Sequence, residues 1–386
     1  MKTIIFAVFI SIAILVYGAV NYYVFIRGWQ ALPKQQTLRL VYAALFILIA
    51  GSFVAGRFAE RAEVSWFSNP LVWVGSFWLA FMLYLTLSLI ALDLLRLSNA
   101  LFHYWPQAIL GRYQTAKLIA FGVILGGTAV AVIAGHINAL KPQIKMLELS
   151  VPKTAKNLKS LNIVMASDIH LGAINGSGRL AKLADMVNAQ EPDIILLAGD
   201  IVDEDIGRVI KDNLGETLKK LKAPLRVYGV TGNHEYIGGA AAAVDYLNAH
   251  GVTMLRDSAV LIDNSFYVAG RDDRSGQRFN GRLRRSLPEL LAGVDRTKPL
   301  ILMDHQPLEL EAVAAQGVDL QFSGHTHHGQ LWPFNYVTQK VYQISRGYEK
   351  IGDTHFYVSS GYGTWGPPVR IGSRPEIVKI VLRFLN

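Results

Sequence analysis

The sequence contains no cysteine and few charged residues. Without cysteine, disulfide scaffolds, thiolate zinc sites and cysteine nucleophiles are excluded, so any metal ion must be held by nitrogen and oxygen ligands. Only 17% of the 386 residues are charged, whereas 51% are hydrophobic, which is high for a soluble protein. The apolar excess is concentrated before residue 141, and the rest of the chain has the composition of an ordinary globular domain.

Acidic residues are too few to balance the basic ones, and the formal net charge is +9. Such a balance suits nucleic acid, anionic lipid or a phosphorylated substrate. The basic residues are scattered, however, with only short groups such as Lys219-Lys220 and Arg284-Arg285. Because a nuclease requires a continuous basic groove, this scatter argues against nucleic acid as a partner.

Four long apolar stretches predict transmembrane helices, at residues 3–26, 40–56, 71–92 and 118–140. A helix needs about 20 apolar residues to cross a bilayer core. Four such runs in succession argue against buried helices of a soluble protein. The first run is also long for a cleaved signal sequence and ends without an obvious small-residue cleavage site. We therefore predict a four-helix membrane anchor over residues 1–140.

The charges between these runs indicate an orientation. Basic residues gather in the first and third connecting segments, at Arg27, Lys34, Arg39, Arg96, Arg112 and Lys117. Positively charged segments remain on the cytoplasmic side, so the C-terminal domain is expected outside the cytoplasm. Lys2, Lys141 and Lys145 argue for the opposite orientation.

A linker is expected over residues 141–157, followed by an α/β domain over residues 158–386. Apolar strands alternate there with amphipathic helices. Strands are predicted at residues 161–166, 193–198, 225–230 and 300–303, and helices at 179–190, 214–221 and 240–250. Short strands around an Asp263-Asn264 turn are expected between residues 252 and 269. The domain is large enough for one α/β core.

Residues of metal-ligand type follow the ends of the predicted strands. The blocks are Asp168-Ile169-His170, Gly199-Asp200-Ile201-Val202-Asp203, Gly232-Asn233-His234-Glu235, Asp304-His305 and Gly324-His325-Thr326-His327-His328. Ligands of open α/β sheets gather at the carboxyl ends of strands, so these blocks are expected to converge. An extended backbone points side chains i and i+2 to the same side. Asp168 and His170 can then hold one ion, and His325 and His327 can face a shared site.

Carboxylate, amide and imidazole ligands without sulfur suit Mn, Fe, Zn or Co. Two ions roughly 4 Å apart are best held by a bridging carboxylate, for which Asp200 is the natural candidate. Such a pair can lower the pKa of a bridging water, giving hydroxide at neutral pH, and can hold a phosphate during in-line attack. The expected cofactors are therefore two divalent metal ions, Mn, Zn or Fe.

The sequence resembles the calcineurin-like metallophosphoesterase superfamily in the order of these blocks over residues 162–376. A single Gly-Asp dipeptide does not identify a family, but five such blocks in the same order as in this superfamily are specific evidence for the resemblance. The resemblance implies an α/β sandwich of two mixed β-sheets flanked by helices. The tail from Val358 to Glu376 is similar to a membrane-anchored bacterial branch related to enzymes that act on envelope lipids, which implies a bacterial inner-membrane protein. His328 departs from that branch, where glycine is common.

The resemblance also implies individual roles. Metal ligands would be Asp168, His170, Asp200 and His327 for the first ion, and Asp200, Asn233, His305 and His325 for the second. His234 would lie beside the phosphate, stabilising charge or protonating the leaving oxygen, so the expected catalytic residues are His234, Asp200 and Asn233. Asp203 would orient a neighbouring side chain.

These features predict a membrane-bound phosphohydrolase that cleaves a phosphoester or pyrophosphate bond by attack of a metal-bridging hydroxide. The expected substrate is phosphorylated and lipid-linked or envelope-related. A metal-binding membrane receptor or scaffold without turnover is an alternative, against which the intact Asn233-His234 block argues. A nuclease is a further alternative. No feature of the sequence predicts the oligomeric state.

Overall fold

The computed structural model describes residues 2–62, 66–156 and 158–385. The chain divides into two compact units, Met1–Gly135 and His136–Asn386. The last residue of the predicted linker, Asn157, lies outside the described residues.

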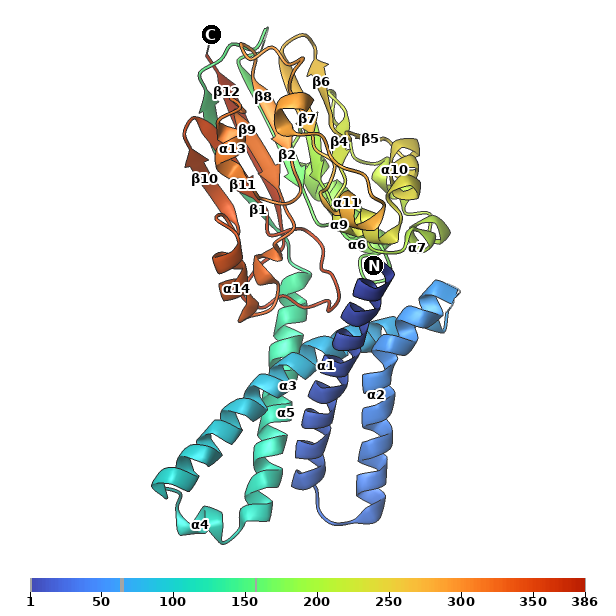
Figure 1. Ribbon diagram of the computed structural model, residues 1–386, viewed down its shortest axis with the longest axis vertical. Coiled ribbons are helices and arrows are strands. Elements are labelled where there is room, and N and C mark those ends of the chain that lie inside the picture. Colours follow the sequence, from blue (N-terminus) through green and yellow to red (C-terminus); the bar gives the residue numbers. More distant parts are fainter. Residues whose placement is uncertain (1, 63–65, 157, 386) are drawn as a thin grey trace. The chain divides into compact units, whose positions relative to one another are not determined.

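The first unit is helical (Figure 1). Its helices are α1 (Lys2–Ala31), α2 (Gln36–Ala62), α3 (Ser68–Phe102), the short α4 (Gln107–Leu110) and α5 (Tyr113–Ala139), whose last turn belongs to the second unit. Four of them, α1, α2, α3 and α5, are long and apolar enough to cross a membrane, as predicted. The helices are longer than the predicted apolar runs because charged residues can also be helical. Helix α3, for example, continues through Asp93 and Arg96.

Close packing of α2 against α3 depends on a glycine. A Cβ at Gly75 would lie 2.3 Å from Cα of Phe53, so only glycine permits this approach. Several polar side chains within the unit are paired. Nε1 of Trp78 donates to Asn21 at 2.9 Å, and Asp93 accepts from Tyr23 at 2.8 Å and forms an ion pair with Arg27. Such pairing is required of polar side chains in an apolar environment.

The second unit is an α/β sandwich of two six-stranded sheets, as the family resemblance implied. The first sheet has the order β1 (Gln143–Val151), β12 (Glu376–Phe384), β2 (Ser160–Ala166), β3 (Ile194–Ala198), β4 (Val227–Val230) and β5 (Val252–Met254). The second has the order β10 (Gly347–Ile351), β11 (Thr354–Val358), β9 (Leu320–Ser323), β8 (Leu300–Met303), β7 (Phe266–Gly270) and β6 (Ser258–Ile262).

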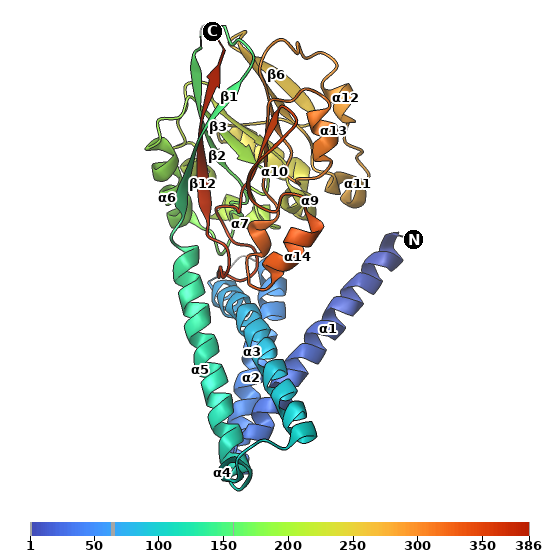
Figure 2. The ribbon, with the colours of Figure 1, turned by 90° about the vertical axis from the view of Figure 1, so that its left-hand side faces the viewer.

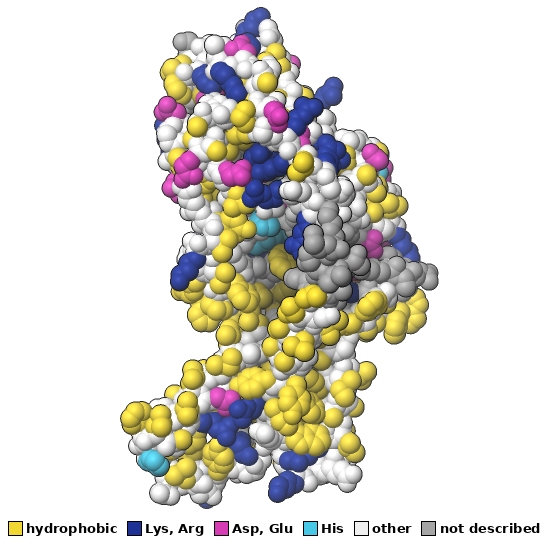
Figure 3. All heavy atoms as spheres, in the orientation of Figure 1, with side chains coloured by type: hydrophobic (Ala, Val, Ile, Leu, Met, Phe, Trp, Pro, Cys, Tyr) yellow, Lys and Arg dark blue, Asp and Glu magenta, His cyan; other side chains and the backbone are white. Residues whose placement is uncertain are grey.

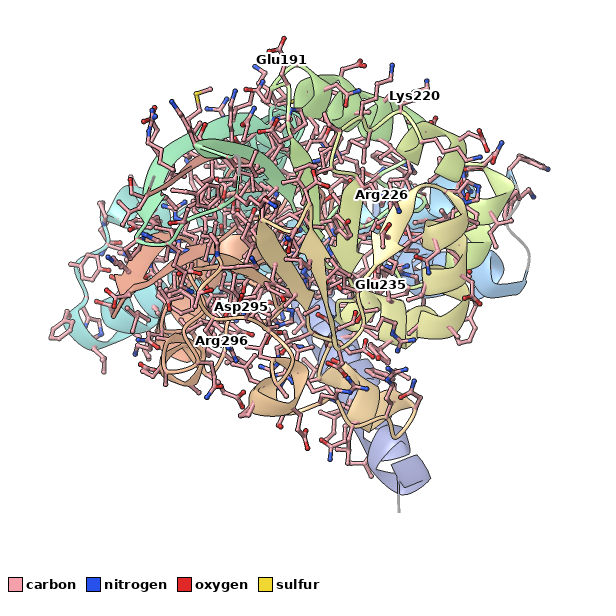
Figure 4. All side chains as sticks on the ribbon, turned by 90° about the horizontal axis from the view of Figure 1, so that it is seen from above. Glu191, Lys220, Arg226, Glu235, Asp295 and Arg296 are labelled. Atoms are coloured by element: carbon pink, nitrogen blue, oxygen red, sulfur yellow. The ribbon has the colours of Figure 1, made fainter. Side chains whose placement is uncertain are left out.

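Most strands are parallel, which gathers their carboxyl ends. In the first sheet β2, β3, β4 and β5 run parallel, and in the second β7, β8, β9 and β11 do. Figure 4 labels Glu191, Arg226 and Arg296 in the segments that lead into β3, β4 and β8. The residues of metal-ligand type follow the other, carboxyl ends of the strands.

The central strands β2, β3, β4, β8 and β9 are buried on both faces, which explains why strands such as β3 and β8 consist of continuous apolar residues. Along β2, Ile163 and Met165 pack between the sheets, while Val164 and Ala166 pack against the helices outside. The remaining helical segments are α6 (Ser177–Asn188), α7 (Ile206–Lys211), α8 (Gly215–Leu218), α9 (Asn233–Gly238), α10 (Ala240–Ala249), α11 (Ser275–Phe279), α12 (Leu287–Leu290), α13 (Leu310–Ala314), the 3-10 turn η1 (His327–Gly329) and α14 (Phe334–Val341).

The segment predicted as a linker contains strand β1. It pairs in parallel with β12 over nine residues, and Figure 2 shows the two strands side by side. Alternate side chains of β1, Leu147, Leu149 and Val151, pack into the core between the sheets. Because the partner strand β12 is far away in the sequence, no local sequence pattern predicted this pairing. Strands β9, β10 and β11 were likewise not predicted.

Candidate metal centre

The predicted ligands converge at one end of the sandwich. Each follows a strand: Asp168 and His170 follow β2, Asp200 and Asp203 follow β3, Asn233 and His234 follow β4, His305 follows β8, and His325 and His327 follow β9. Because the strands come from both sheets, the site is built where the carboxyl ends of the two sheets meet.

Asp168, His170 and His327 form one cluster of side chains that can hold a metal ion. Nε2 of His170 lies 3.1 Å from Nε2 of His327, which lies 3.4 Å from Oδ1 of Asp168. All three residues are buried. Asp168 also accepts a hydrogen bond from the backbone N–H of His325 at 2.8 Å, which ties the first cluster to the segment after β9.

Asp200, His305 and His325 form a second cluster. Nε2 of His305 lies 3.1 Å from Oδ2 of Asp200, and its Nδ1 is 2.8 Å from the carbonyl oxygen of Ala198. Asn233 joins this cluster, because its Oδ1 lies 2.7 Å from Nδ1 of His325. Asp200 also faces the first cluster, with Oδ2 3.9 Å from Nε2 of His170. This is the position that a carboxylate shared by two ions would occupy.

The backbone of the ligand segments is not extended, contrary to the expectation from sequence. Asp168, His170, Asp200, His325 and His327 have φ between 45° and 71°. This left-handed region is rare outside glycine, and its clustering marks a site at which the surrounding fold imposes the conformation. Asp168 and His170 still share a cluster. His325 and His327 do not, because the left-handed turn between them directs their rings to different clusters.

Two glycines of the sequence blocks make room for ligand carboxylates. A Cβ at Gly232 would lie 2.1 Å from Oδ1 of Asp200, and one at Gly324 would lie 2.3 Å from Oδ2 of Asp168. Any larger residue would displace the carboxylate, so these glycines serve close approach rather than flexibility.

Two further carboxylates orient the site. Asp203 accepts a hydrogen bond from Nδ1 of His234 at 2.9 Å, the kind of role that the resemblance implied for it. Glu235, for which the sequence suggested no role, accepts from the backbone N–H groups of Val202 at 2.9 Å and Gly232 at 2.7 Å. Glu235 thereby holds the segments after β3 and β4 together.

Burial and mutual charge set the protonation of the clusters. Burial on its own would raise the pKa of Asp200, but His305 and His234 hold it well below its ordinary value. Burial would lower the pKa of His305, and Asp200 raises it well above the ordinary value. Burial, followed by the charge of His305, lowers the pKa of His325 to about 4.

His327 and His234 respond in opposite directions. Burial, followed by the charge of Arg370, holds the pKa of His327 well below its ordinary value, so this ring is neutral, as a metal ligand must be. Burial would lower the pKa of His234 as well, but Asp200 and Asp203 raise it to about 9. His234 is therefore an imidazolium at neutral pH.

A cavity of about 470 Å³ opens beside the clusters. Its polar side is formed by Asp200, Asn233, His234, His325 and His327, and its apolar side by Ile237, Phe334, Val337, Tyr342 and Trp365. None of the eight residues of α14, all of them described, is buried, and Val337 is 55% exposed. Figure 3 shows histidine side chains in a hollow with hydrophobic side chains nearby.

The side chains fit divalent metal ions. Two ligands about 2.1 Å from one ion, at angles of 90–109°, are about 3.0–3.4 Å apart. The separations of His170 from His327, of His327 from Asp168 and of His305 from Asp200 are 3.1, 3.4 and 3.1 Å. Among the described residues, Nδ1 of His170 is buried without a hydrogen-bond partner, which is costly unless another group satisfies it.

Two positions near the centre were left open or missed by sequence reasoning. His328 neither lines the cavity nor joins a cluster; its Nδ1 lies 3.0 Å from Oγ of Ser345. Arg370 was missed as a site residue, although Nη2 of its buried side chain lies 3.1 Å from Nδ1 of His327. The similarity of the tail to one family branch was the signal that pointed to this region.

Comparison with known proteins places the chain among phosphoesterases. Residues 161–329 match the family described as calcineurin-like phosphoesterase. An uncharacterized metallophosphoesterase of Aquifex aeolicus is 34% identical over 258 residues, covering 66% of this chain and 98% of that protein. An uncharacterized metallophosphoesterase of Campylobacter jejuni is 29% identical over 387 residues, covering 98% of this chain and 99% of that protein. A Danio rerio protein named transmembrane protein with metallophosphoesterase domain is 32% identical over 269 residues, covering 66% of this chain and 61% of that protein.

Proposed function

This chain belongs to the calcineurin-like metallophosphoesterase family, and on that premise we propose that it hydrolyses a phosphoester or pyrophosphate bond of a lipid-linked substrate. Its four apolar helices make it a membrane protein. The proposed location is the inner membrane of a bacterium, with the catalytic domain outside the cytoplasm and an envelope-related substrate.

The two-sided character of the cavity carries this proposal. One side consists of the clustered His and Asp side chains, and the other consists of exposed apolar side chains such as Phe334 and Trp365. Soluble proteins seldom leave such residues grouped at the surface without a ligand or partner. A substrate that joins a phosphate to an apolar chain matches both sides.

Two divalent ions, Mn, Zn or Fe, are the proposed cofactors. The first would be held by Asp168, His170, Asp200 and His327, and the second by Asp200, Asn233, His305 and His325. Bound ions of this kind supply Lewis acidity and hydroxide at neutral pH. Asp200 would serve both ions, which is supported by its position between the two clusters.

His234 is the proposed general acid. Its Nδ1 donates to Asp203 at 2.9 Å, which fixes the ring and leaves Nε2 to donate to a phosphate oxygen or to the leaving oxygen. The raised pKa, about 9, keeps this proton in place at neutral pH. Asn233 would position the substrate beside His325, to which it is hydrogen-bonded.

The experiment compares four purified full-length proteins in detergent with added Mn: wild type, Asp200→Asn, His234→Ala and His250→Gln. Hydrolysis of bis-p-nitrophenyl phosphate should fall about 100-fold or more in the first two variants. His250, whose ring bonds the carbonyl of Tyr246, is the matched control and should retain activity. Equal activity in all four would refute the catalytic assignment.

A substrate panel then tests the lipid. Lipid-linked phosphates and pyrophosphates should be cleaved with higher kcat/KM than water-soluble nucleotides of the same phosphate linkage. Faster hydrolysis of plain DNA than of lipid phosphates would instead support a nuclease.

A further inference from the structure

A second polar cavity, of about 680 Å³, lies in the second unit beside α12 and α13. Four arginines line it, namely Arg271, Arg274, Arg284 and Arg285, together with Glu309 and the apolar residues of the two helices. We call it the arginine pocket. The Arg284-Arg285 pair noted in the sequence lines this pocket and does not belong to the metal centre.

The arginine pocket adjoins the metal centre through consecutive residues. Asp304 accepts from Nη1 of Arg271 at 3.0 Å and from Nη1 of Arg284 at 3.1 Å. His305, the next residue, directs its ring to Asp200 and Ala198. Leu287 and Val313, which line the pocket, pack with the side chains of β8 that point away from the core between the sheets, whereas the metal centre lies beyond the carboxyl ends of the strands.

The carboxylates around the pocket are shared among more arginines than they can neutralise. Glu309 lies within 4 Å of three of them: 3.2 Å from Arg274, 3.5 Å from Arg284 and 3.8 Å from Arg271. Asp304 is shared by two. Three guanidinium groups thus share two carboxylates, and Nη1 of Arg285 contacts the backbone carbonyl oxygen of Asp257 at 3.5 Å, so the guanidinium groups outnumber the carboxylates that they contact. Nε of Arg271, moreover, is buried without a hydrogen-bond partner among the described residues.

We propose that the arginine pocket binds a phosphate dianion at a site separate from the metal centre. Planar guanidinium groups match the spacing of phosphate oxygens and bind them in bidentate fashion. A dianion would neutralise the excess charge. Glu309, which is 51% exposed, occupies the place of the ligand and is its competitor. On the face shown in Figure 3, Lys and Arg side chains gather close to the hollow that contains histidines.

The phosphate can come from two sources with the same chemistry, a phospholipid headgroup or free phosphate. Pockets of about 300–1,000 Å³ hold small ligands, so either fits by volume. The pocket serves binding rather than hydrolysis, since none of the described residues that line it belongs to a cluster that can hold a metal ion.

The test is calorimetric titration of inorganic phosphate into the full-length protein in detergent with EDTA, at constant ionic strength. Arg274→Gln/Arg285→Gln removes two exposed guanidinium groups and should weaken binding about tenfold. Arg274→Lys/Arg285→Lys keeps the charges and should bind phosphate with intermediate affinity. Arg383→Gln removes an exposed arginine of β12 that is paired with Glu148 of β1, and this variant is the matched control. Glu309→Gln should tighten binding about threefold, a gain that misfolding does not produce.

The source is distinguished in nanodiscs. Phosphatidic acid added to phosphatidylcholine should lower the apparent affinity for inorganic phosphate if a headgroup occupies the pocket, and should leave it unchanged if only free phosphate enters. Both results support a phosphate site. Equal phosphate affinity in wild type, Arg274→Gln/Arg285→Gln and Glu309→Gln would overturn it. Because EDTA is present throughout, this outcome is independent of metal-dependent hydrolysis.

Discussion

Arg370 places Nη2 3.1 Å from Nδ1 of His327, and both side chains are buried. The guanidinium also donates to the carbonyl oxygens of Ser360 at 2.7 Å and Gly363 at 2.6 Å. The Arg370 side chain therefore contacts both the segment after β11 and a proposed metal ligand. Burial lowers the pKa of His327 most, and the positive charge of Arg370 lowers it further.

Replacing Arg370 should therefore weaken metal binding. Arg370→Gln removes hydrogen bonds to the carbonyl oxygens of Ser360 and Gly363, which order the backbone beside His327, and we expect Mn affinity to fall about tenfold because this positioning is lost. Arg370→Lys retains the charge without the planar fork and should lie between. The measurement is Mn titration followed by electron paramagnetic resonance, with Arg383→Gln as the control. Unchanged affinity and spectrum in folded Arg370→Gln would show that Arg370 does not position His327.

Metal uptake should release protons. His305 has a pKa well above its ordinary value because Asp200 outweighs the effect of burial, so the ring is protonated at neutral pH. It must lose a proton before its nitrogen can bind metal. Apparent affinity should rise with pH, by about tenfold per pH unit for each proton released. Calorimetry of Mn binding in Tris and in HEPES measures this, because the heats differ by the buffer ionisation. Identical heats would contradict the assignment.

Asp203 should set the alkaline limit of activity. It is one of the two carboxylates that raise the pKa of His234 to about 9 against the effect of burial. Asp203→Asn should lower that pKa, so the protonated form is lost at lower pH. The alkaline limb of kcat/KM should move to lower pH by about one unit. Asp212→Asn, which removes an ion pair with Arg208 elsewhere, should leave the limb in place. An unshifted limb in Asp203→Asn would exclude His234 as the acid.

The apolar side of the cavity should favour amphiphilic substrates. Val337 lines the cavity and is 55% exposed, so Val337→Asn should preserve the fold. Loss of a buried contact to an acyl chain should raise KM for a lipid-linked substrate by about tenfold, from about 1.5 kcal/mol of apolar burial. The ratio of KM for lipid-linked and water-soluble substrates is the measurement. Ile210→Asn, at a residue 54% exposed on α7, is the control. An unchanged ratio argues that the lipid lies elsewhere.

The absence of cysteine allows a direct topology test. Lys220→Cys adds one exposed thiol to the catalytic domain, and Arg112→Cys adds one between α4 and α5. If the domain lies outside the cytoplasm, a membrane-impermeant maleimide should label Lys220→Cys in intact spheroplasts. Arg112→Cys should react only after permeabilisation. The reverse pattern would place the domain in the cytoplasm.

The membrane helices and the ligand blocks were predictable because their signals are local. An apolar run such as residues 71–92 identifies a span without reference to the rest of the chain, and α3 includes that run. The types of ligand in blocks such as Gly232-Asn233-His234-Glu235 likewise limit the chemistry before any contact is known. The turn at Asp263-Asn264 was also predictable, and both residues adopt the positive φ that asparagine and aspartate tolerate.

Contacts between distant segments were not predictable in the same way. Strand β1 is a strand because β12, more than 200 residues later, pairs with it. Arg370 reaches His327 across 43 residues, and no local pattern distinguishes it from a surface arginine. His325 and His327 line one cavity, but they belong to different clusters, a division that the family resemblance implied and that their i, i+2 spacing did not.

By itself, then, the order of residues determined that the chain has four apolar helices and a domain with nitrogen and oxygen ligands at its strand ends, because hydrophobicity and ligand chemistry belong to single side chains. The tertiary structure decided which ligands share a cluster, that Asp200 faces both clusters, and that apolar residues of α14 border them. These features depend on the distances between residues that are far apart in the sequence. Such residues come close together only when the two sheets pack and bring their carboxyl ends together.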